Sequence, residues 1–357
     1  MTHRADTKQL LRLLFWESTI KCNLACAHCR RLESDAAADS DMSTTQARQL
    51  IDQLAQLGQG QSMMPVIVFS GGEPLCRPDI FALTEYATSL QIPSALATNG
   101  TMLNEKIAAK IKGSGITRVS VSLDGADAET HNRLRRQHGA FDRAVEGISH
   151  LRAADVPFQI NFTLTKHNTH QLADVYNLAK SLGAVALHIF MLVPVGCGQV
   201  LAETDMLSPE QYEAKMIEIY QLEKCGDLQL KVTCGPHYQR VIRQQGGPPG
   251  DNPGGHRPSK GCLAGLGVLF VSHAGDVFPC GYLPVNCGNV LNQPLSDIWR
   301  TSPDLARMRD TTALEGKCRV CGYREICGGC RARAYAATGN YMAEEPFCAY
   351  IPPEAAH

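Results

Sequence analysis

The stretch Cys22-Asn23-Leu24-Ala25-Cys26-Ala27-His28-Cys29 places three thiols close together, in the spacing C-x3-C-x2-C, directly after an apolar run at 11–16. A four-thiolate zinc or iron–sulfur site needs four cysteines, and this stretch supplies three. If it holds an iron–sulfur cubane, one iron has no protein ligand and is open to another molecule. The alternative is a zinc knuckle whose fourth ligand lies elsewhere in the chain.

The composition indicates a large protein that uses cysteine for metal or redox chemistry. The chain has 357 residues, of which 44% are hydrophobic, which is more than one average domain needs. A net charge of -1 argues against a general binder of nucleic acid or membrane surfaces. We find no apolar run long enough to span a membrane and no signal-peptide centre, so we expect a cytoplasmic protein. In such a protein, 15 cysteines indicate metal sites rather than disulfides.

The cysteines fall into groups. Three lie at 22–29, five lie at 318–348, and Cys262 and Cys280 stand between them. The other five are scattered and are interpreted as ordinary thiols: Cys76, Cys197, Cys225, Cys234 and Cys287.

Short apolar runs alternate with amphipathic stretches over the first half of the chain. Strands are predicted at 13–18, 66–70, 94–98, 118–123, 159–164 and 186–192, and helices at 44–57, 79–90, 104–112, 140–153 and 171–182. These β-α units imply a parallel sheet, but they are too few for a closed eight-stranded barrel. A partial (β/α)6 barrel and an open doubly wound sheet both fit. In either fold, functional residues lie at the carboxyl ends of the strands, where the cysteine triad is predicted to lie.

The chain is expected to divide into three parts. Residues 1–195 form the α/β core, and 196–257 form a linker with helices near 209–222 and 236–243 and a strand at 228–232. Residues 258–357 have little apolar periodicity and most of the remaining cysteines. A region so small and poor in core usually needs metal to hold its shape.

Two further motifs follow predicted strands. Ser70-Gly71-Gly72-Glu73-Pro74 follows the second strand and, considered alone, is a tight strand-to-helix turn. The fourth strand ends Ser120-Val121-Ser122-Leu123-Asp124-Gly125, whose alternate polar residues share one face or are ordinary strand-end residues. After it comes His131-Asn132-Arg133-Leu134-Arg135-Arg136-Gln137-His138-Gly139-Ala140-Phe141.

Together the triad, these motifs and the β-α pattern resemble the radical S-adenosylmethionine (SAM) superfamily. The resemblance implies a partial (β/α)6 TIM barrel and a [4Fe–4S] cluster on Cys22, Cys26 and Cys29, whose open iron chelates SAM. His28 stands where that family most often has Tyr or Phe. Reductive cleavage of SAM then gives a 5′-deoxyadenosyl radical, which is chemistry that belongs to the cofactor.

The resemblance also implies which residues contact SAM. Gly71 and Gly72 let the backbone approach the methionine moiety, and Glu73 accepts from its ammonium group. Ser122 contacts SAM, and the guanidinium of Arg135 pairs with its carboxylate, although Asn132 and Arg136 depart from the family pattern. The candidates for the ribose, or alternatively turn and strand-edge residues, are Asn99 and Asn161.

The tail carries a second signal, Cys262-x12-Gly275-x4-Cys280, Cys318-x2-Cys321-x5-Cys327-x2-Cys330 and Cys348. Its C-x2-C pairs would also suit a zinc ribbon. These cysteines resemble the SPASM extension, a C-terminal cysteine-rich iron–sulfur domain with two auxiliary [4Fe–4S] clusters, although the last pair is usually C-x3-C. The resemblance assigns Cys318, Cys321, Cys327 and Cys348 to an outer cluster, and Cys262, Cys280 and Cys330 to an inner one. The inner cluster then lacks a fourth ligand, unless Cys287 or a neighbour supplies it.

Three functions are open: an enzyme acting on a small macrocycle, a SPASM peptide maturase, and an iron–sulfur electron carrier. The Gly-Gly-Glu turn argues against a carrier, which needs no SAM pocket. Over about residues 11–352 the chain resembles the enzymes of the siroheme-dependent heme pathway and of heme d1 synthesis. The stretch 191–196 and the block 260–265 are most similar to the heme synthases, which convert two propionates of iron-coproporphyrin III to vinyl groups. The alternatives within this group are a didecarboxysiroheme deacetylase and a heme d1 enzyme.

The resemblance to heme synthases sets the expected partners. The substrate is iron-coproporphyrin III or a related tetrapyrrole, and the products are protoheme, CO2, 5′-deoxyadenosine and methionine. An electron donor such as ferredoxin or flavodoxin is expected, the protein is a monomer, and it binds no nucleic acid. Arg30 and Arg31 are candidates for the substrate carboxylates because they follow the triad directly. An auxiliary cluster is the expected acceptor of the electron that decarboxylation releases.

Overall fold

The computed structural model describes residues 10–31, 41–247 and 260–355, and its centre is one ten-stranded sheet. The strand order is β10-β9-β8-β1-β2-β3-β4-β5-β6-β7. Six strands correspond to the predicted units: β1 (Leu13–Glu17), β2 (Val66–Ser70), β3 (Ser94–Thr98), β4 (Ile116–Ser122), β5 (Phe158–Leu164) and β6 (Ala186–Met191). Neighbours in this run pair in parallel, which confirms the predicted α/β partial barrel.

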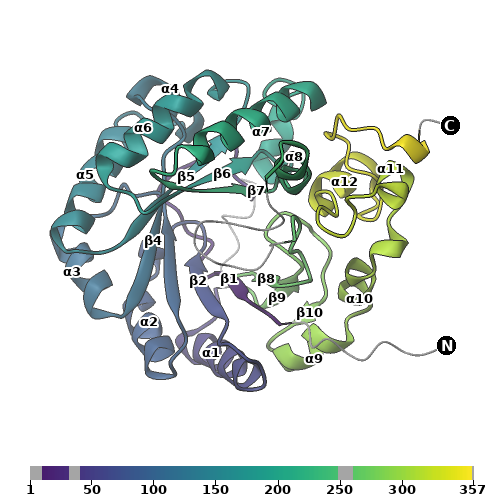
Figure 1. Ribbon diagram of the computed structural model, residues 1–357. Helices are drawn as coiled ribbons and strands as arrows, with labels where there is room; N and C mark the ends of the chain where they lie inside the picture. The colour runs from purple at the N-terminus through teal and green to yellow at the C-terminus, as the bar shows by residue number, and fades with distance from the viewer. Residues whose placement is uncertain (1–9, 32–40, 248–259, 356–357) are drawn as a thin grey trace.

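The helices between these strands form an arc around the outside of the sheet (Figure 1). They are α1 (Thr44–Gln59), α2 (Ile80–Ser89), α3 (Glu105–Gly113), α4 (Ala128–Arg135), α5 (Ala140–Ala153) and α6 (Leu172–Leu182). Ser43 begins α1 with a capping box that includes Gln46, so two orphan N–H groups are satisfied. The sequence predicted these helices within about two residues, except for α4, which it missed.

Successive side chains along each strand point to opposite faces of the sheet. Ile67, Phe69, Val119 and Val121 are fully buried against the helices. Residues of the opposite register, such as Ser122, line an interior cavity instead. One face of the sheet therefore supplies the core, and the other is available for ligands.

Four strands extend the sheet beyond the six predicted units. At one edge β7 (Gln229–Thr233), which lies between α7 (Pro209–Lys224) and α8 (Tyr238–Gln244), pairs in parallel with β6. At the other edge β8 (Val268–Val271) pairs in parallel with β1. β9 (Asp276–Phe278) and β10 (Gly288–Asn289) continue from β8 in antiparallel fashion. The cysteine-rich segment therefore begins inside the barrel sheet.

Four short helices complete the cysteine-rich segment, to the right of the sheet in Figure 1: α9 (Leu295–Thr301), α10 (Pro303–Arg309), α11 (Gly316–Val320) and α12 (Arg331–Thr338). Trp299 of α9 belongs to the same core as Trp16 of β1, whereas Cys330 belongs to a smaller core with Leu283 and Met342. The expected boundary after residue 257 lies outside the described residues, and the boundary after 195 stays a prediction. Within the described ranges no helix is both long and apolar enough to cross a bilayer.

A shared core predicts a shared unfolding transition. Leu269→Ala, at a fully buried site in β8, should lower the free energy of unfolding by about 3 kcal/mol. Tryptophan fluorescence of Trp16→Phe and Trp299→Phe backgrounds would report on the two segments separately. We expect Leu269→Ala to shift the unfolding midpoints reported by the two tryptophans together. Val320→Ala, at an exposed site, should shift neither midpoint. A shift confined to one tryptophan would contradict the shared core.

Candidate functional site

A cavity of about 190 Å³ lies at the carboxyl ends of the parallel strands. Most of the predicted site residues line it: Cys22, Cys26, Cys29, Arg30, Arg31, Gly72, Asn99, Ser122, Arg135 and Asn161. His28 of the triad motif lines it too, and three lining residues that the sequence did not single out are Thr163, Phe190 and Tyr282. Gly71 and Glu73 are not among the lining residues.

The Gly-Gly-Glu turn packs on the chain that leads into the triad. The Gly72 N–H donates to the Thr19 carbonyl at 2.7 Å, and the Glu73 N–H donates to the Lys21 carbonyl at 2.8 Å. A Cβ on Gly71 would lie 2.6 Å from the Thr19 oxygen, and a Cβ on Gly72 would lie 2.3 Å from the Lys21 oxygen. The close approach that requires glycine here is to the protein's own backbone.

Glu73 is buried and uses its carboxylate to fix the next loop. It accepts from the Asn99 N–H and the Thr98 hydroxyl, both at 2.8 Å, and from the Leu75 N–H at 3.2 Å. Burial raises its pKa to about 7, against the effect of these hydrogen bonds. The Asn99 side chain stabilises the same loop, because it donates to Asn23 and accepts from the Thr101 N–H.

The predicted SAM ligand Arg135 forms a buried ion pair with Asp124, with Nη2 2.7 Å from Oδ2. The same Asp124 oxygen lies 3.2 Å from His28 Nε2, and Arg135 Nη1 lies 3.8 Å from the Cys26 sulfur. Burial alone would raise the pKa of Asp124, but Arg135 and then His28 hold it well below its usual range. Asp124 thus joins the strand end, the helix α4 and the triad loop.

A second buried carboxylate, Glu17, lies at the end of β1. It pairs with Arg30, and its Oε2 lies 2.8 Å from His273 Nδ1 in the turn between β8 and β9. Burial would raise the pKa of Glu17, but Arg30 and His273 lower it to about 2. Arg30 also stacks on Phe270 of β8, with 4.2 Å between the guanidinium carbon and the ring centre.

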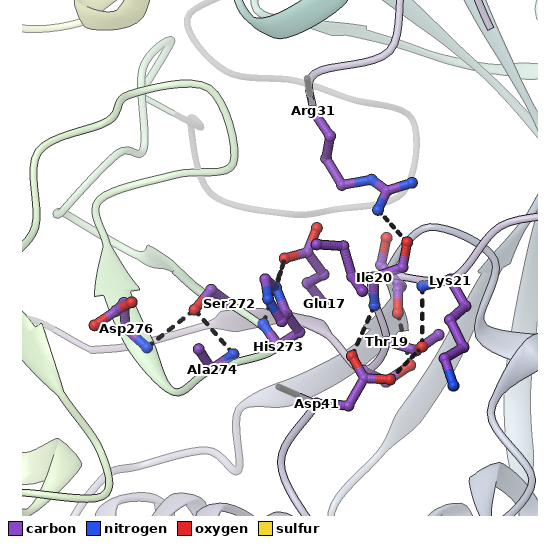
Figure 2. A network of polar contacts seen from close by, with 12 residues as sticks. Glu17, Thr19, Ile20, Lys21, Arg31, Asp41, Ser272, His273, Ala274 and Asp276 are labelled. Atoms are coloured by element: carbon purple, nitrogen blue, oxygen red, sulfur yellow. Dashed lines mark hydrogen bonds and ion pairs between the residues drawn. The ribbon is translucent and has the colours of Figure 1, made fainter. Parts of the chain in front are cut away.

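Figure 2 shows the contact between Glu17 and His273 together with the polar contacts of the chain before the triad. Asp41 accepts from the Thr19 hydroxyl at 2.5 Å and from the Ile20 N–H at 2.9 Å. Arg31 donates to the Ile20 carbonyl. The backbone before the triad is therefore tied both to Asp41 and to the cysteine-rich segment.

The outer cysteines lie together. Cys318, Cys321, Cys327 and Cys348 line one cavity, as their assignment to one cluster requires. Arg240 Nη2 lies 3.8 Å from the Cys348 sulfur. His237 lines the same cavity, and its ring nitrogens have no hydrogen-bond partner in the part of the chain that is described.

The inner cysteines also lie together, with an addition that the sequence missed. Cys330 and Cys280 pack in the smaller core, and Cys234 packs there with them. Burial, and then the neighbouring charge of Cys262, raises the pKa of Cys280 to about 12. Cys262 likewise acts on Cys330, whose pKa is raised to about 11, chiefly by burial.

Tyr282 lies between the triad and the inner cysteines. It lines the first cavity, and burial raises the pKa of its hydroxyl. After burial the thiol of Cys234 contributes most to this rise, and Cys280 and Cys29 add to it. Tyr282 thus contacts both the cavity at the triad and the smaller core that contains Cys234, Cys280 and Cys330.

Two family matches cover the triad and the first part of the cysteine-rich segment. The radical SAM superfamily matches residues 16–179, and SPASM, an iron–sulfur cluster-binding domain, matches residues 262–322. The chain is 46% identical to an AdoMet-dependent heme synthase of Methanosarcina barkeri (strain Fusaro / DSM 804), over 96% of this chain and 97% of that protein.

The chain belongs to the radical SAM superfamily.

Two weaker likenesses extend this result. A pre-heme d1 synthase of Dinoroseobacter shibae (strain DSM 16493 / NCIMB 14021 / DFL 12) is 28% identical, over 94% of this chain and 85% of that one. Streptococcus suis SuiB, crystallised with its precursor peptide SuiA, has the same fold, with a TM-score of 0.76 and 16% identity. That superposition covers 96% of this chain and 76% of SuiB. This radical SAM enzyme therefore uses SAM, a SAM-binding [4Fe–4S] cluster and auxiliary iron–sulfur clusters.

The residues at the first cavity fit SAM bound to such a cluster. His28 Nδ1, Arg31 Nε and Arg135 Nε are buried and have no hydrogen-bond partner among the described residues. The Arg135 Nε–H would be satisfied by an anion such as the SAM carboxylate, and the Arg31 Nε–H by a second anion. The Leu24 N–H donates to the Cys22 sulfur at 3.4 Å, which favours a thiolate there.

The outer cysteines also fit a cluster, because their sulfurs accept hydrogen bonds from the backbone. Cys318, Cys321 and Cys327 each accept a backbone N–H at 3.4 Å. Hydrogen bonds of this kind stabilise thiolates that bind iron. Among residues 10–31, 41–247 and 260–355 no three Cys, His, Asp or Glu side chains lie close enough for a single ion. The thiolates of a cubane lie farther apart than the ligands of one ion.

The Glu17 network predicts a pH-dependent stability. Glu17→Gln should lower the free energy of unfolding by about 3 kcal/mol near pH 6, because Arg30 loses a buried partner. Folding lowers the pKa of Glu17 from 4.5 to about 2, so its contribution is present above pH 4.5 and is lost as the pH falls toward 2. Folding raises the pKa of His273 from 6.5, so its contribution is present below pH 6.5 and is lost as the pH rises through the folded value.

The difference between the wild type and Glu17→Gln should therefore be largest between pH 4.5 and 6.5. Denaturant unfolding at a series of pH values measures it. Glu85→Gln, at an exposed site in α2, is the matched control and should show no such maximum. A difference that does not vary with pH would contradict the role of the Glu17–His273 pair.

Proposed function

We propose that this radical SAM enzyme is an AdoMet-dependent heme synthase that converts two propionate side chains of iron-coproporphyrin III to vinyl groups. The observation that carries the proposal is the 46% identity to a heme synthase, which extends over both cluster regions. The cavity agrees with an anionic substrate, because Arg30 and Arg31 line it beside the triad. The proposed setting is the cytoplasm, where the protein acts as a monomer fed by a ferredoxin or flavodoxin.

Each turnover removes one propionate carboxyl group. SAM held at a reduced cluster on Cys22, Cys26 and Cys29 would supply the radical chemistry that removes a hydrogen atom from the propionate β-carbon. The side chain then loses CO2 and one electron and becomes a vinyl group, so two propionates consume two SAM. The electron needs an acceptor near the substrate. The packing of Cys280, Cys330 and Tyr282 in one core, with Tyr282 also lining the triad cavity, supports the inner cysteines as the site of this acceptor.

The protein's own residues position the cofactor in this proposal. Asp124 fixes Arg135 beside Cys26, which leaves the Arg135 Nε for the SAM carboxylate. Ser122 and Asn161 line the same cavity and complete the polar wall around SAM. Glu73 accepts a hydrogen bond from the Asn99 N–H and so holds the loop that carries Asn99 in place.

The two arginines differ as candidates for the substrate carboxylates. Arg30 is paired with Glu17, so its charge is largely balanced within the protein. Arg31 donates to a backbone carbonyl but has a buried Nε without a partner among the described residues. Arg31 is therefore the stronger candidate.

A turnover assay tests the proposed reaction. The reconstituted protein, anaerobic and reduced, is incubated with SAM and iron-coproporphyrin III. We expect the porphyrin to lose the mass of two formic-acid equivalents, with two 5′-deoxyadenosine formed per porphyrin. SAM cleavage without porphyrin conversion would refute the substrate, and a parallel incubation with didecarboxysiroheme would reveal a deacetylase.

Removal of Arg31 should affect the substrate more than the cofactor. Arg31→Ala should raise the Kd for iron-coproporphyrin III about tenfold, which is ~1.4 kcal/mol, because a charge-assisted hydrogen bond is lost. Titration by porphyrin absorbance measures it. Lys106→Ala, at an exposed site in α3, is the control. An unchanged porphyrin Kd in Arg31→Ala would exclude a role for Arg31 in substrate binding.

A further inference from the structure

The inner cysteine set has three members by its family pattern, and a closed four-thiolate cubane needs four. We propose that Cys234 is the fourth ligand of the inner auxiliary cluster, together with Cys262, Cys280 and Cys330. This inference concerns the cluster-binding fold and is independent of the porphyrin reaction proposed above.

The sheet brings Cys234 to the inner set. Cys234 follows β7 directly, so it lies at the carboxyl end of the sheet where the other functional residues gather. It packs in the smaller core with Cys280 and Cys330. Cys234 and two of its three proposed partners therefore share one small core.

The backbone at Cys234 gives an independent observation. Its φ is 58°, in the left-handed region that residues other than glycine rarely adopt. Such a conformation is strained and persists where the surroundings enforce it, often at functional sites. Gly235 follows directly, and a Cβ on it would lie 2.6 Å from a Val232 methyl carbon, so the turn is tightly packed. The turn holds the thiol at one position beside the inner set.

The other candidate for this position lies elsewhere. Cys287 packs against the main core and not the smaller one, and its sulfur lies 3.5 Å from the Val285 carbonyl. The charged groups that act on it are Asp304 and Arg309, and no thiol is among them. Cys234 therefore replaces Cys287 as the expected ligand.

A fourth thiolate changes what the inner cluster can do. A cubane with four cysteine ligands has no open iron, so it cannot bind a substrate carboxylate directly. Its remaining role is to accept an electron, and Tyr282 is the side chain between it and the triad. The buried Arg333, which acts on both Cys234 and Cys330, offsets part of the added negative charge.

The first test uses a background in which the triad cysteines are replaced by alanine, so that no cluster with an open iron is expected. A cubane with an open iron loses that iron on mild oxidation and gives a [3Fe–4S] signal in electron paramagnetic resonance. We expect no such signal in the background after ferricyanide treatment, and one [3Fe–4S] centre per chain after Cys234→Ser. Cys287→Ser is the matched control and should resemble the background. Equal signals and equal iron contents in the two serine variants would overturn the assignment.

The second test needs no substitution and covers a variant that fails to fold. Iodoacetamide labelling of the iron-loaded wild type, read by peptide mass spectrometry, should modify the exposed Cys225 at least tenfold faster than Cys234. Removal of iron with a chelator should release Cys234 for labelling. Labelling of Cys234 at the rate of Cys225 in the iron-loaded protein would overturn the proposal. Neither test contains porphyrin, so its result is separate from that of the heme synthase proposal.

Discussion

The parallel pairing of β8 with β1 is the constraint on which the site depends. Leu13 to Trp16 of β1 lie in register with Val268 to Val271 of β8. β1 leads into the triad, and β8 leads, through β9, into the loop that carries Cys280 and Tyr282. Because the two strands share hydrogen bonds, the radical site and the auxiliary cysteines have a fixed relation and do not depend on a flexible linker between domains.

Two buried carboxylates reinforce this relation from opposite sides of the triad. Asp124 holds Arg135, whose guanidinium also reaches the Cys26 sulfur, and Glu17 holds Arg30 and His273. A buried ion pair contributes little net stability, but removal of one partner leaves an uncompensated charge. The pairs therefore act mainly to specify geometry: they keep the triad loop and the β8–β9 turn in one arrangement before any ligand binds.

Much of this fold could be predicted from local pattern, since β2 and β3 have the predicted bounds. Helix α4 could not, because its buried face consists mostly of polar residues such as His131 and Arg135, and both are satisfied in the structure by Asp124. The cluster cysteines could be picked out from their spacing, whereas their division into clusters came from the family resemblance, and the structure places the triad at one cavity and the four outer cysteines at another. Cys234 carries no spacing signal, because it reaches the inner set only after β7 joins the sheet.

The most direct measurement follows the hydrogen that the proposed reaction transfers. Iron-coproporphyrin III deuterated at the β-carbons of its propionates is incubated with the reduced enzyme and SAM, and the 5′-deoxyadenosine is analysed by mass spectrometry. If the cavity at the triad holds SAM against a porphyrin propionate, each 5′-deoxyadenosine formed carries one deuterium. If SAM is cleaved but the 5′-deoxyadenosine contains no deuterium, the porphyrin propionate is not the hydrogen donor and the proposed function is wrong.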